Sequence, residues 1–250
     1  MSIDIWHYAD PMLQPMQLKN MESILKSTET LLYRPKLKSF RYLGKIKERD
    51  IVTTLEGDGL YAYATVDSNY TIASQWQGYS LKDIYAINTI NGEKKLVQKA
   101  WKGSLLAPSY EGNILVYYDE ALKQYKSYQT QTGVVNVIAK DIKTLLYDED
   151  NDMPDDPNAY GIIKWIDNST QFLLYDRYDI WLVDALGIKP AEKLTNGRKT
   201  KTVYRYIDTD SEQKTIKQGS DLLIKGYNEI DKSESLAILA LNNRKLFVIN

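Results

Sequence analysis

Short apolar runs separated by turn residues dominate this chain, and the pattern is clearest between Tyr147 and Gly197. That stretch starts with an acidic loop and continues with four runs, Ile162–Ile166, Gln171–Tyr175, Asp179–Val183 and Pro190–Leu194. Runs of about four to eight residues rich in Ile, Leu, Tyr and Trp, bounded by turn residues, are typical of strands. The stretch therefore predicts one antiparallel meander.

The third run has counterparts earlier in the chain. Asp83–Asn88 (DIYAIN) is followed by Asn91-Gly92, Gln124–Gln129 (QYKSYQ) by Thr132-Gly133, and Asp179–Asp184 (DIWLVD) by Gly187. The spacing from the start of the first of these segments to the start of the second is close to the period of about 40 residues that four-stranded propeller blades show. The spacing from the second segment to the third is longer, and the excess is about the length of the acidic loop. A strand of this pattern is typically the third of its blade, so the three are expected in three different sheets.

The remaining runs fit the same scheme. We expect a strand at Ile3–Tyr8, a short surface helix at Gln14–Ser27 and a loop through Trp76 and Gly78. Further strands are expected at Thr30–Arg34, Leu37–Leu43, Ile51–Leu55, Leu60–Val66, Lys94–Val97, Ile114–Tyr118, Val134–Ile138, Leu222–Tyr227, Ser235–Leu241 and Lys245–Ile249. These make about five blade-like units, the first and last irregular. The expected fold is all-β, a partial β-propeller occupying residues 1–250 as one domain; a β-sandwich is the structural alternative.

Composition narrows the classes of function. The 32 Lys and Arg residues balance 33 Asp and Glu, which gives no global reason to expect nucleic acid as a partner. The chain has no Cys, hence neither disulfides nor thiolate metal ligands, and no apolar run is long enough for a membrane span. Nothing at Met1–Pro15 resembles a signal peptide. No cofactor is expected.

The residues also argue against catalysis by this chain alone. A nucleophile elbow needs G-x-S-x-G, and neither Gly103-Ser104 nor Gly219-Ser220 has that spacing. The one histidine, His7, lies within a strand-like pattern, where no orienting carboxylate or nucleophile can be argued, so we expect it to be structural. The prediction is therefore a chain that is not an enzyme by itself.

The acidic loop is the best candidate for a functional site. Within nine positions it carries six carboxylates and no base: Asp148, Glu149, Asp150, Asp152, Asp155 and Asp156. Their repulsion disfavours a compact loop unless cations or donors neutralise it. One interpretation is a solvated loop stiffened by Pro154 and Pro157. Another is calcium, because Asp148-x-Asp150-x-Asp152 begins like an EF-hand loop, although Met153 and Ala159 replace the glycine and closing glutamate of that motif.

Several segments together resemble a known family. They are Asp4–Tyr8 (DIWHY), Asp83-Ile84-Tyr85, Tyr147–Pro157 (YDEDNDMPDDP), Tyr160-Gly161, Tyr175–Trp181 (YDRYDIW), Leu194–Gly197 (LTNG) and Leu222–Glu229 (LLIKGYNE). The chain resembles the N-terminal propeller of large prolyl oligopeptidase-family serine peptidases of the Bacteroides type, which are dipeptidyl peptidase IV-like. The resemblance implies a partner α/β-hydrolase domain in the same full-length protein, gating of short peptide substrates, and a periplasmic or other extracytoplasmic location.

The resemblance also suggests roles for site residues. Dipeptidyl peptidase IV-like propellers clamp the substrate's free α-amine with a short Tyr-Glu-Glu-containing segment, and Tyr147–Asp150 is similar in composition. It thus implies that Asp148, Glu149 and Asp150 bind the peptide N-terminus. Arg177 is either a receptor for a peptide carboxylate or carbonyl, or a partner of Asp176 or Asp179 at a blade turn.

Three alternatives complete the expectations. The basic run Lys193, Arg198, Lys199 and Lys201 is interpreted as a solvated loop. In place of a peptidase domain, the chain could be a stand-alone propeller that binds proteins or ligands. An incomplete ring leaves apolar blade faces bare, so self-association is expected through Met1–Leu43 or Leu222–Asn250.

Overall fold

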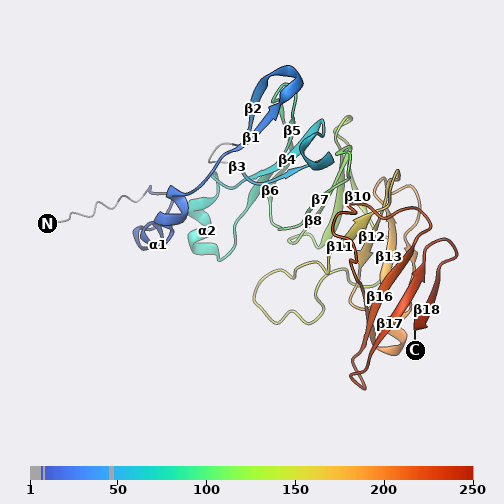
Figure 1. The fold of residues 1–250 in the computed structure, drawn as a ribbon. Coiled ribbons are helices and arrows are strands. Elements are labelled where there is room, and N and C mark those ends of the chain that lie inside the picture. The colour runs from blue at the N-terminus through green and yellow to red at the C-terminus, as the bar shows by residue number, and fades with distance from the viewer. Residues whose placement is uncertain (1–6, 8, 45–47, 250) are drawn as a thin grey trace. The chain divides into compact units, whose positions relative to one another are not determined.

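A computed structural model describes residues 7, 9–44 and 48–249, and antiparallel strands account for most of its regular structure (Figure 1). The strands of the first half are β1 Thr30–Arg34, β2 Ser39–Gly44, β3 Glu48–Thr53, β4 Tyr61–Val66, β5 Lys82–Asn88 and β6 Lys94–Trp101. Those of the second half are β7 Leu106–Pro108, β8 Ile114–Asp119, β9 Gln124–Gln129, β10 Val135–Ile138, β11 Ile162–Trp165, β12 Gln171–Tyr175, β13 Ile180–Asp184, β14 Glu192–Lys193, β15 Thr202–Tyr206, β16 Asp221–Asn228, β17 Glu234–Ala240 and β18 Lys245–Ile249. The helices are α1 Gln14–Leu25, α2 Thr71–Gln77 and α3 Gly197–Thr200, with 3-10 turns at Pro35–Leu37 and Leu55–Gly57.

The strands form four four-stranded sheets and one hairpin within the described residues. The sheets are β3–β6, β7–β10, β11–β14 and β15–β18, and in each the strands pair antiparallel in chain order. Four-stranded meanders of this kind are propeller blades. The all-β, propeller-type prediction is confirmed, as is the short helix near the N-terminus. The last unit is a regular blade, contrary to expectation.

The three strands singled out by sequence lie in three sheets, each as the third strand, as predicted. They are β5, β9 and β13. In two of them the leading Asp is a buried hydrogen-bond acceptor: Asp83 accepts from the Tyr70 hydroxyl at 2.5 Å and the Ala100 amide at 2.9 Å, and Asp179 accepts from the Gly197 amide. A β-sandwich would have placed these strands on shared sheets, so the alternative is wrong.

The chain divides into two compact units, 1–102 and 103–250. In the first, the β1–β2 hairpin packs on the sheet β3–β6: Leu32 and Leu43 contact a buried cluster that contains Ala62, Ala64 and Ile87. The hairpin is the irregular first unit expected from the sequence.

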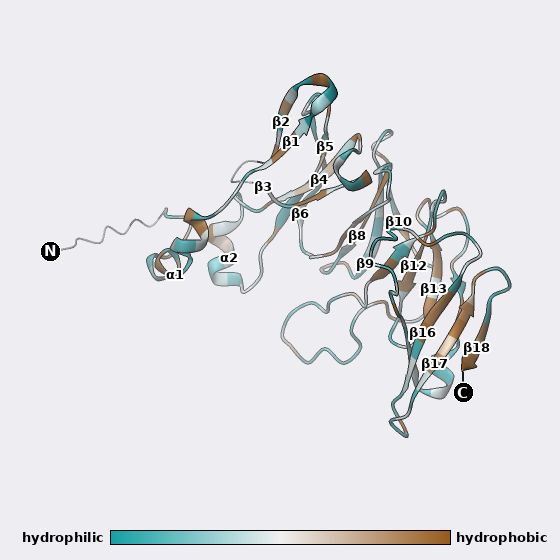
Figure 2. Ribbon diagram, viewed as in Figure 1, coloured by the Kyte–Doolittle hydropathy of each residue, from teal (hydrophilic) through white to brown (hydrophobic). Residues whose placement is uncertain are grey.

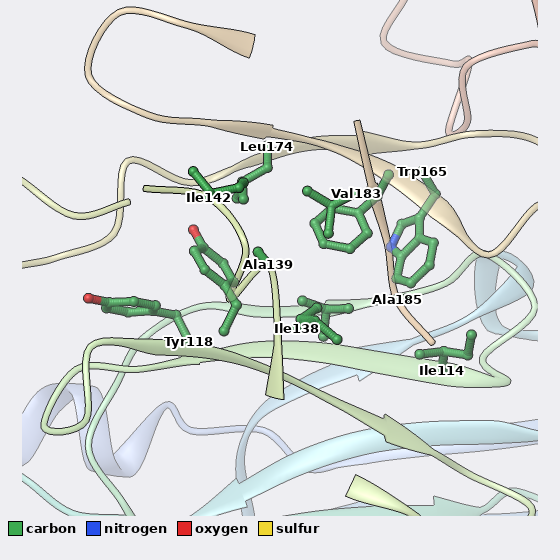
Figure 3. Packing of buried hydrophobic residues seen from close by; sticks show 12 residues of the cluster. Ile114, Tyr118, Ile138, Ala139, Ile142, Trp165, Leu174, Val183 and Ala185 are labelled. Atoms are coloured by element: carbon green, nitrogen blue, oxygen red, sulfur yellow. The ribbon is translucent and has the colours of Figure 1, made fainter. Parts of the chain in front are cut away.

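In the second unit, three blades pack face to face, and the middle blade buries both of its faces. On β12, Phe172 and Leu174 point into the cluster shared with β7–β10, where Val116 and Ile138 lie (Figure 3). The intervening Leu173 points into the cluster shared with β15–β18. Because successive strand residues face opposite sides, a strand that is apolar at every position must be covered twice. This packing is why the runs of the sequence read as continuous rather than alternating.

Three local expectations need correction or fall outside the structure. The segment around Trp76 is not a loop but helix α2, which ends at Gly78 with a φ of 75°. The basic run is not simply a solvated loop, since Lys193 lies in β14, Arg198 and Lys199 lie in α3, and Lys201 directly follows α3. The expected strand at Ile3–Tyr8 lies outside the described residues except for His7, which is exposed and in no strand.

Candidate functional site

The acidic loop is tied together at its base (the yellow-green loop of Figure 1). Tyr147 and Ala159 form an isolated antiparallel bridge, and the Asp148 amide donates to the Asn158 carbonyl at 2.9 Å. Inside the loop the Asp150 amide donates to an Asp148 carboxylate oxygen at 3.1 Å. The loop therefore leaves and re-enters the fold at one point, which places the carboxylates that follow Tyr147 beside the body of the second unit.

Glu149 faces inward and meets an arginine of α3. Arg198 donates to both of its carboxylate oxygens, at 2.5 and 3.2 Å, which is the bidentate geometry that suits a guanidinium. The hydrogen bond with Glu149, together with the nearby Asp176 carboxylate at 3.9 Å, raises the pKa of Arg198. The Glu149 amide also donates to the Tyr160 hydroxyl at 2.8 Å. Glu149 is thus held by both its side chain and its backbone.

Arg177, on the β12–β13 turn, holds the second loop carboxylate. Its guanidinium lies 2.7 Å from Asp150 and 3.1 Å from Glu229, which follows β16. Burial works against the charge of Arg177, but the two carboxylates outweigh it and raise its pKa. The expected pairing with Asp176 or Asp179 is not found, because those two carboxylates turn away into the blade.

Tyr178 lies between these ion pairs. Arg177, Arg198 and Lys201 lie over its ring, with their charged groups 5.2, 5.0 and 5.2 Å from its centroid. Its hydroxyl donates to Glu229 at 2.7 Å. Burial and this hydrogen bond to a carboxylate raise the pKa of Tyr178 to about 12. We call the set Glu149, Asp150, Arg177, Tyr178, Arg198, Lys201 and Glu229 the Tyr178 cluster.

Two buried aspartates support the Tyr178 cluster from below, and both are 0% exposed. Asp176 accepts from the amides of Tyr178 and Asp179, at 2.8 and 2.7 Å, and from the Trp181 indole at 3.0 Å. Asp179 accepts from the Thr195 hydroxyl, from two amides of the α3 start and from Lys193, whose ammonium lies 2.8 Å away. These bonds fix the turn that carries Arg177 and Tyr178 against the segment that carries Arg198.

Arg205 of β15 lies behind Arg177. It donates to the Arg177 carbonyl at 3.0 Å and stacks over Tyr175, 4.6 Å from the ring centroid. Burial lowers its pKa. Its contacts are to the carbonyls of Arg177 and Tyr204 and to the rings of Tyr175 and Tyr160, so Arg205 adds positive charge beneath the turn without an ion-pair partner among the described residues.

The structure thus brings together three of the four candidate residues. Glu149, Asp150 and Arg177 join the Tyr178 cluster, whereas Asp148 is exposed and its carboxylate accepts from the Asp150 amide within the loop. Sequence reasoning missed Tyr178, Glu229, Arg198 and Lys201 as site residues. One signal was available: Tyr178 and Glu229 both occupy the turn between the second and third strands of their blades, and equivalent turns of neighbouring blades lie at the same end.

The carboxylates of the loop do not converge on one point. Glu149 and Asp150 are directed to different arginines, and no group of three or more His, Cys, Asp or Glu side chains could hold a metal ion in the part of the chain that the structure describes. What the arrangement offers is a set of paired charges on one end of two blades. In the part of the chain that the structure describes, Asp148 and Asp150 each use one carboxylate oxygen and leave the other open to a ligand.

Comparisons with known proteins yield structural similarity alone. No protein-family model and no curated protein matches the sequence. An oligogalacturonate lyase solved with manganese has 10% identity and a TM-score of 0.49, over 88% of this chain and 58% of that one. TolB from Acinetobacter baumannii has 8% identity and a TM-score of 0.41 over 88% and 59%. Acylaminoacyl peptidase from Pyrococcus horikoshii has 13% and 0.32 over 81% and 39%. The chain spans 58% of the length of the first of these proteins.

Proposed function

We propose that this chain is the non-catalytic propeller domain of a prolyl oligopeptidase-family serine peptidase, gating short peptides and helping to bind the substrate N-terminus. The observation that carries the proposal is the Tyr178 cluster with its acidic loop, which presents carboxylates at one end of the blades. A peptide ammonium has three donors and makes strong bonds to carboxylates. In this proposal the chain has no peptidase activity of its own, acts with a hydrolase domain of the same protein, and works outside the cytoplasm.

The contacts within the cluster refine which residues meet the ammonium. Glu149 is already bound at both oxygens by Arg198, so a ligand gains little there. Asp150 uses one oxygen for Arg177, and Asp148 uses one for a loop amide. The ligand ammonium would therefore bridge Asp148 and Asp150, with Glu149 holding the loop in place and Arg177 next to the bound peptide.

Binding of short peptides to the purified chain tests this proposal. We expect a peptide with a free N-terminus to bind and its N-acetylated form to bind at least about tenfold more weakly, because acetylation removes the charge. Asp148→Asn combined with Asp150→Asn should reproduce that loss. Asp152→Asn is the matched control, since Asp152 is an exposed carboxylate of the same loop without a side-chain partner among the described residues. Equal binding of the two peptides would contradict the proposal, as would turnover of X-Pro chromogenic substrates that a serine-directed phosphonate abolishes.

A stand-alone binding scaffold is the second candidate. One observation favours it: Glu149, Asp150 and Glu229 each have a cationic partner within the chain, so the cluster is electrically satisfied without a ligand. A scaffold of this kind would bind a partner independently of any free amine. Binding that is unaffected by acetylation and by substitution of Asp148 and Asp150 would support it.

A further inference from the structure

The last blade, β15–β18, has one covered face and one open face. Its covered face contributes Leu222, Ile224, Ala237 and Leu239 to the cluster shared with β11–β14, and each is 4% exposed or less. The intervening residues lie on the other face because side chains alternate along a strand. There Leu236, Phe247 and Ile249 are 44%, 51% and 48% exposed. Figure 2 shows the apolar character of β17 and β18.

The strand register arranges the open face in rows across β16, β17 and β18. One row is Leu223, Ile238 and Phe247, and the next is Lys225, Leu236 and Ile249. The row on the other side of Leu223 starts at Asp221 on β16 and ends at Lys245 on β18, with Ala240 between them. The open face therefore has an apolar centre, with opposite charges at the two ends of one row and Lys225 at the end of another.

The two opposite charges have no ion-pair partner among the described residues. Asp221 and Lys245 are separated by the width of β17, which is about 10 Å across two strand spacings. The other charged pair of this face, Lys225 and Glu234, is already joined at 2.6 Å. The face thus carries one complementary pair of charges that its own chain leaves unjoined.

We propose that the open face of β15–β18 binds a second copy of this chain, face to face, about a two-fold axis parallel to the strands. With the axis over β17, that rotation keeps each row in place and exchanges β16 with β18. Asp221 of one copy then lies opposite Lys245 of its partner, twice per dimer, and Leu223 lies opposite Phe247. Ile238 meets its own counterpart near the axis. A second copy of the same face covers the apolar centre and supplies an opposite charge for both Asp221 and Lys245. Face-to-face sheet contact is also the way in which the blades of this unit cover one another.

The size of the face sets the strength of the interaction. The three strands that face each other, about 4.8 Å apart and about six residues long, cover roughly 300 Å² per copy, or about 600 Å² in the pair. Stable interfaces bury about 1,200–2,000 Å², so the dimer is a weak one that forms at micromolar concentrations and above. Opposed charges at its rim make it sensitive to salt.

Sedimentation velocity of the full chain over a concentration series up to about 0.1 mM tests the proposal. We expect reversible dimerisation, weakened at least about tenfold by Phe247→Glu, which places a charge in the apolar centre. Asp221→Lys should also weaken it, because Lys then faces Lys, and the double exchange Asp221→Lys with Lys245→Asp should restore it to within about threefold of the original. Circular dichroism confirms that each variant is folded.

Phe40→Glu is the matched control, because Phe40 is 65% exposed on the β1–β2 hairpin in the other unit. It should leave dimerisation unchanged. A monomer throughout the concentration series would overturn the proposal. So would association that Phe40→Glu abolishes and Phe247→Glu leaves intact, which would place the contact on the hairpin. Failure of the double exchange to restore association would overturn the two-fold arrangement.

Discussion

Replacing Asp179 with Asn should lower the stability of the second unit substantially, although the two side chains have nearly the same shape. One oxygen of Asp179 accepts from the Thr195 hydroxyl at 2.8 Å and the Gly197 amide at 2.5 Å, and an Asn oxygen can keep both bonds. The other oxygen lies 2.8 Å from the Lys193 ammonium and accepts from the Arg198 amide at 3.3 Å. In the variant an NH2 group faces these two donors, so both bonds are lost and the ammonium loses its counter-charge.

The expected loss follows from burial. Removing one partner of a buried ion pair costs about 3–5 kcal/mol. Lys193 is 31% exposed and can turn towards water, which moves the estimate to the lower end, about 3 kcal/mol. Domains of this size lose about 2–4 °C in Tm per kcal/mol, so the melting temperature should fall by roughly 6–12 °C. The loss is a large share of a total stability of about 5–15 kcal/mol.

Urea unfolding followed by tryptophan fluorescence measures this change, because Trp165 and Trp181 lie in the affected blade. Asp152→Asn removes an exposed carboxylate and should change the free energy of unfolding by less than about 0.5 kcal/mol. Lys193→Met in the Asp179→Asn background should cost little more, since its partner is already gone. A loss below about 1 kcal/mol for Asp179→Asn would refute the view that this carboxylate holds α3 against the β12–β13 turn.

Three further changes test other parts of the structure. Gly197→Ala should prevent α3 from closing, because its Cβ would lie 2.0 Å from the Thr202 carbonyl oxygen, and thermal unfolding should show a large loss. The Asp184 carboxylate is buried, but the Thr170 hydroxyl and three amides outweigh burial and lower its pKa. Its stabilising effect is therefore complete above about pH 4 and is lost as the pH falls through the lowered pKa. The difference in free energy of unfolding between the parent and Asp184→Asn should accordingly shrink as the pH falls in acid-unfolding curves. The pKa of Tyr178 is raised to about 12, so the stability it contributes is present below about pH 10 and lost as the pH rises towards 12; Tyr178→Phe should remove that alkaline transition in unfolding curves.

The fold was predictable because its units are local. A four-stranded meander joins neighbouring strands by short turns, so apolar runs and turn residues specify most of the pairing. The repeated strand pattern has a physical cause at both ends of the strand. At the start, Asp83 accepts a hydrogen bond from the Ala100 amide. At the end, Asn88 accepts hydrogen bonds from the Ile90 and Asn91 amides of the following turn. The pattern marks the third strand because these contacts belong to that position.

Elements without such local signals were missed. β15 follows Arg198, Lys199 and Lys201, and this basic run suggests a solvated loop until its partners are known. Those partners come from distant segments: Arg198 meets Glu149, and Lys193 meets the buried Asp179. Helix α2 was missed for another reason, since its Trp76 is 78% exposed and gives no apolar face to detect.

The same non-local pairing explains why the acidic loop could not be interpreted from its own residues. Six carboxylates without a base predict mutual repulsion, which bound cations or hydrogen-bond donors would have to offset. The fold supplies such donors itself: Arg198 neutralises Glu149, and Arg177 neutralises Asp150 while also holding Glu229. Arg177 comes from the β12–β13 turn and Arg198 from α3, and the hydrogen bonds of Asp179 hold these two segments together. The loop therefore offers a ligand less charge than its six carboxylates suggest, because Glu149 and one oxygen of Asp150 are already paired with arginines.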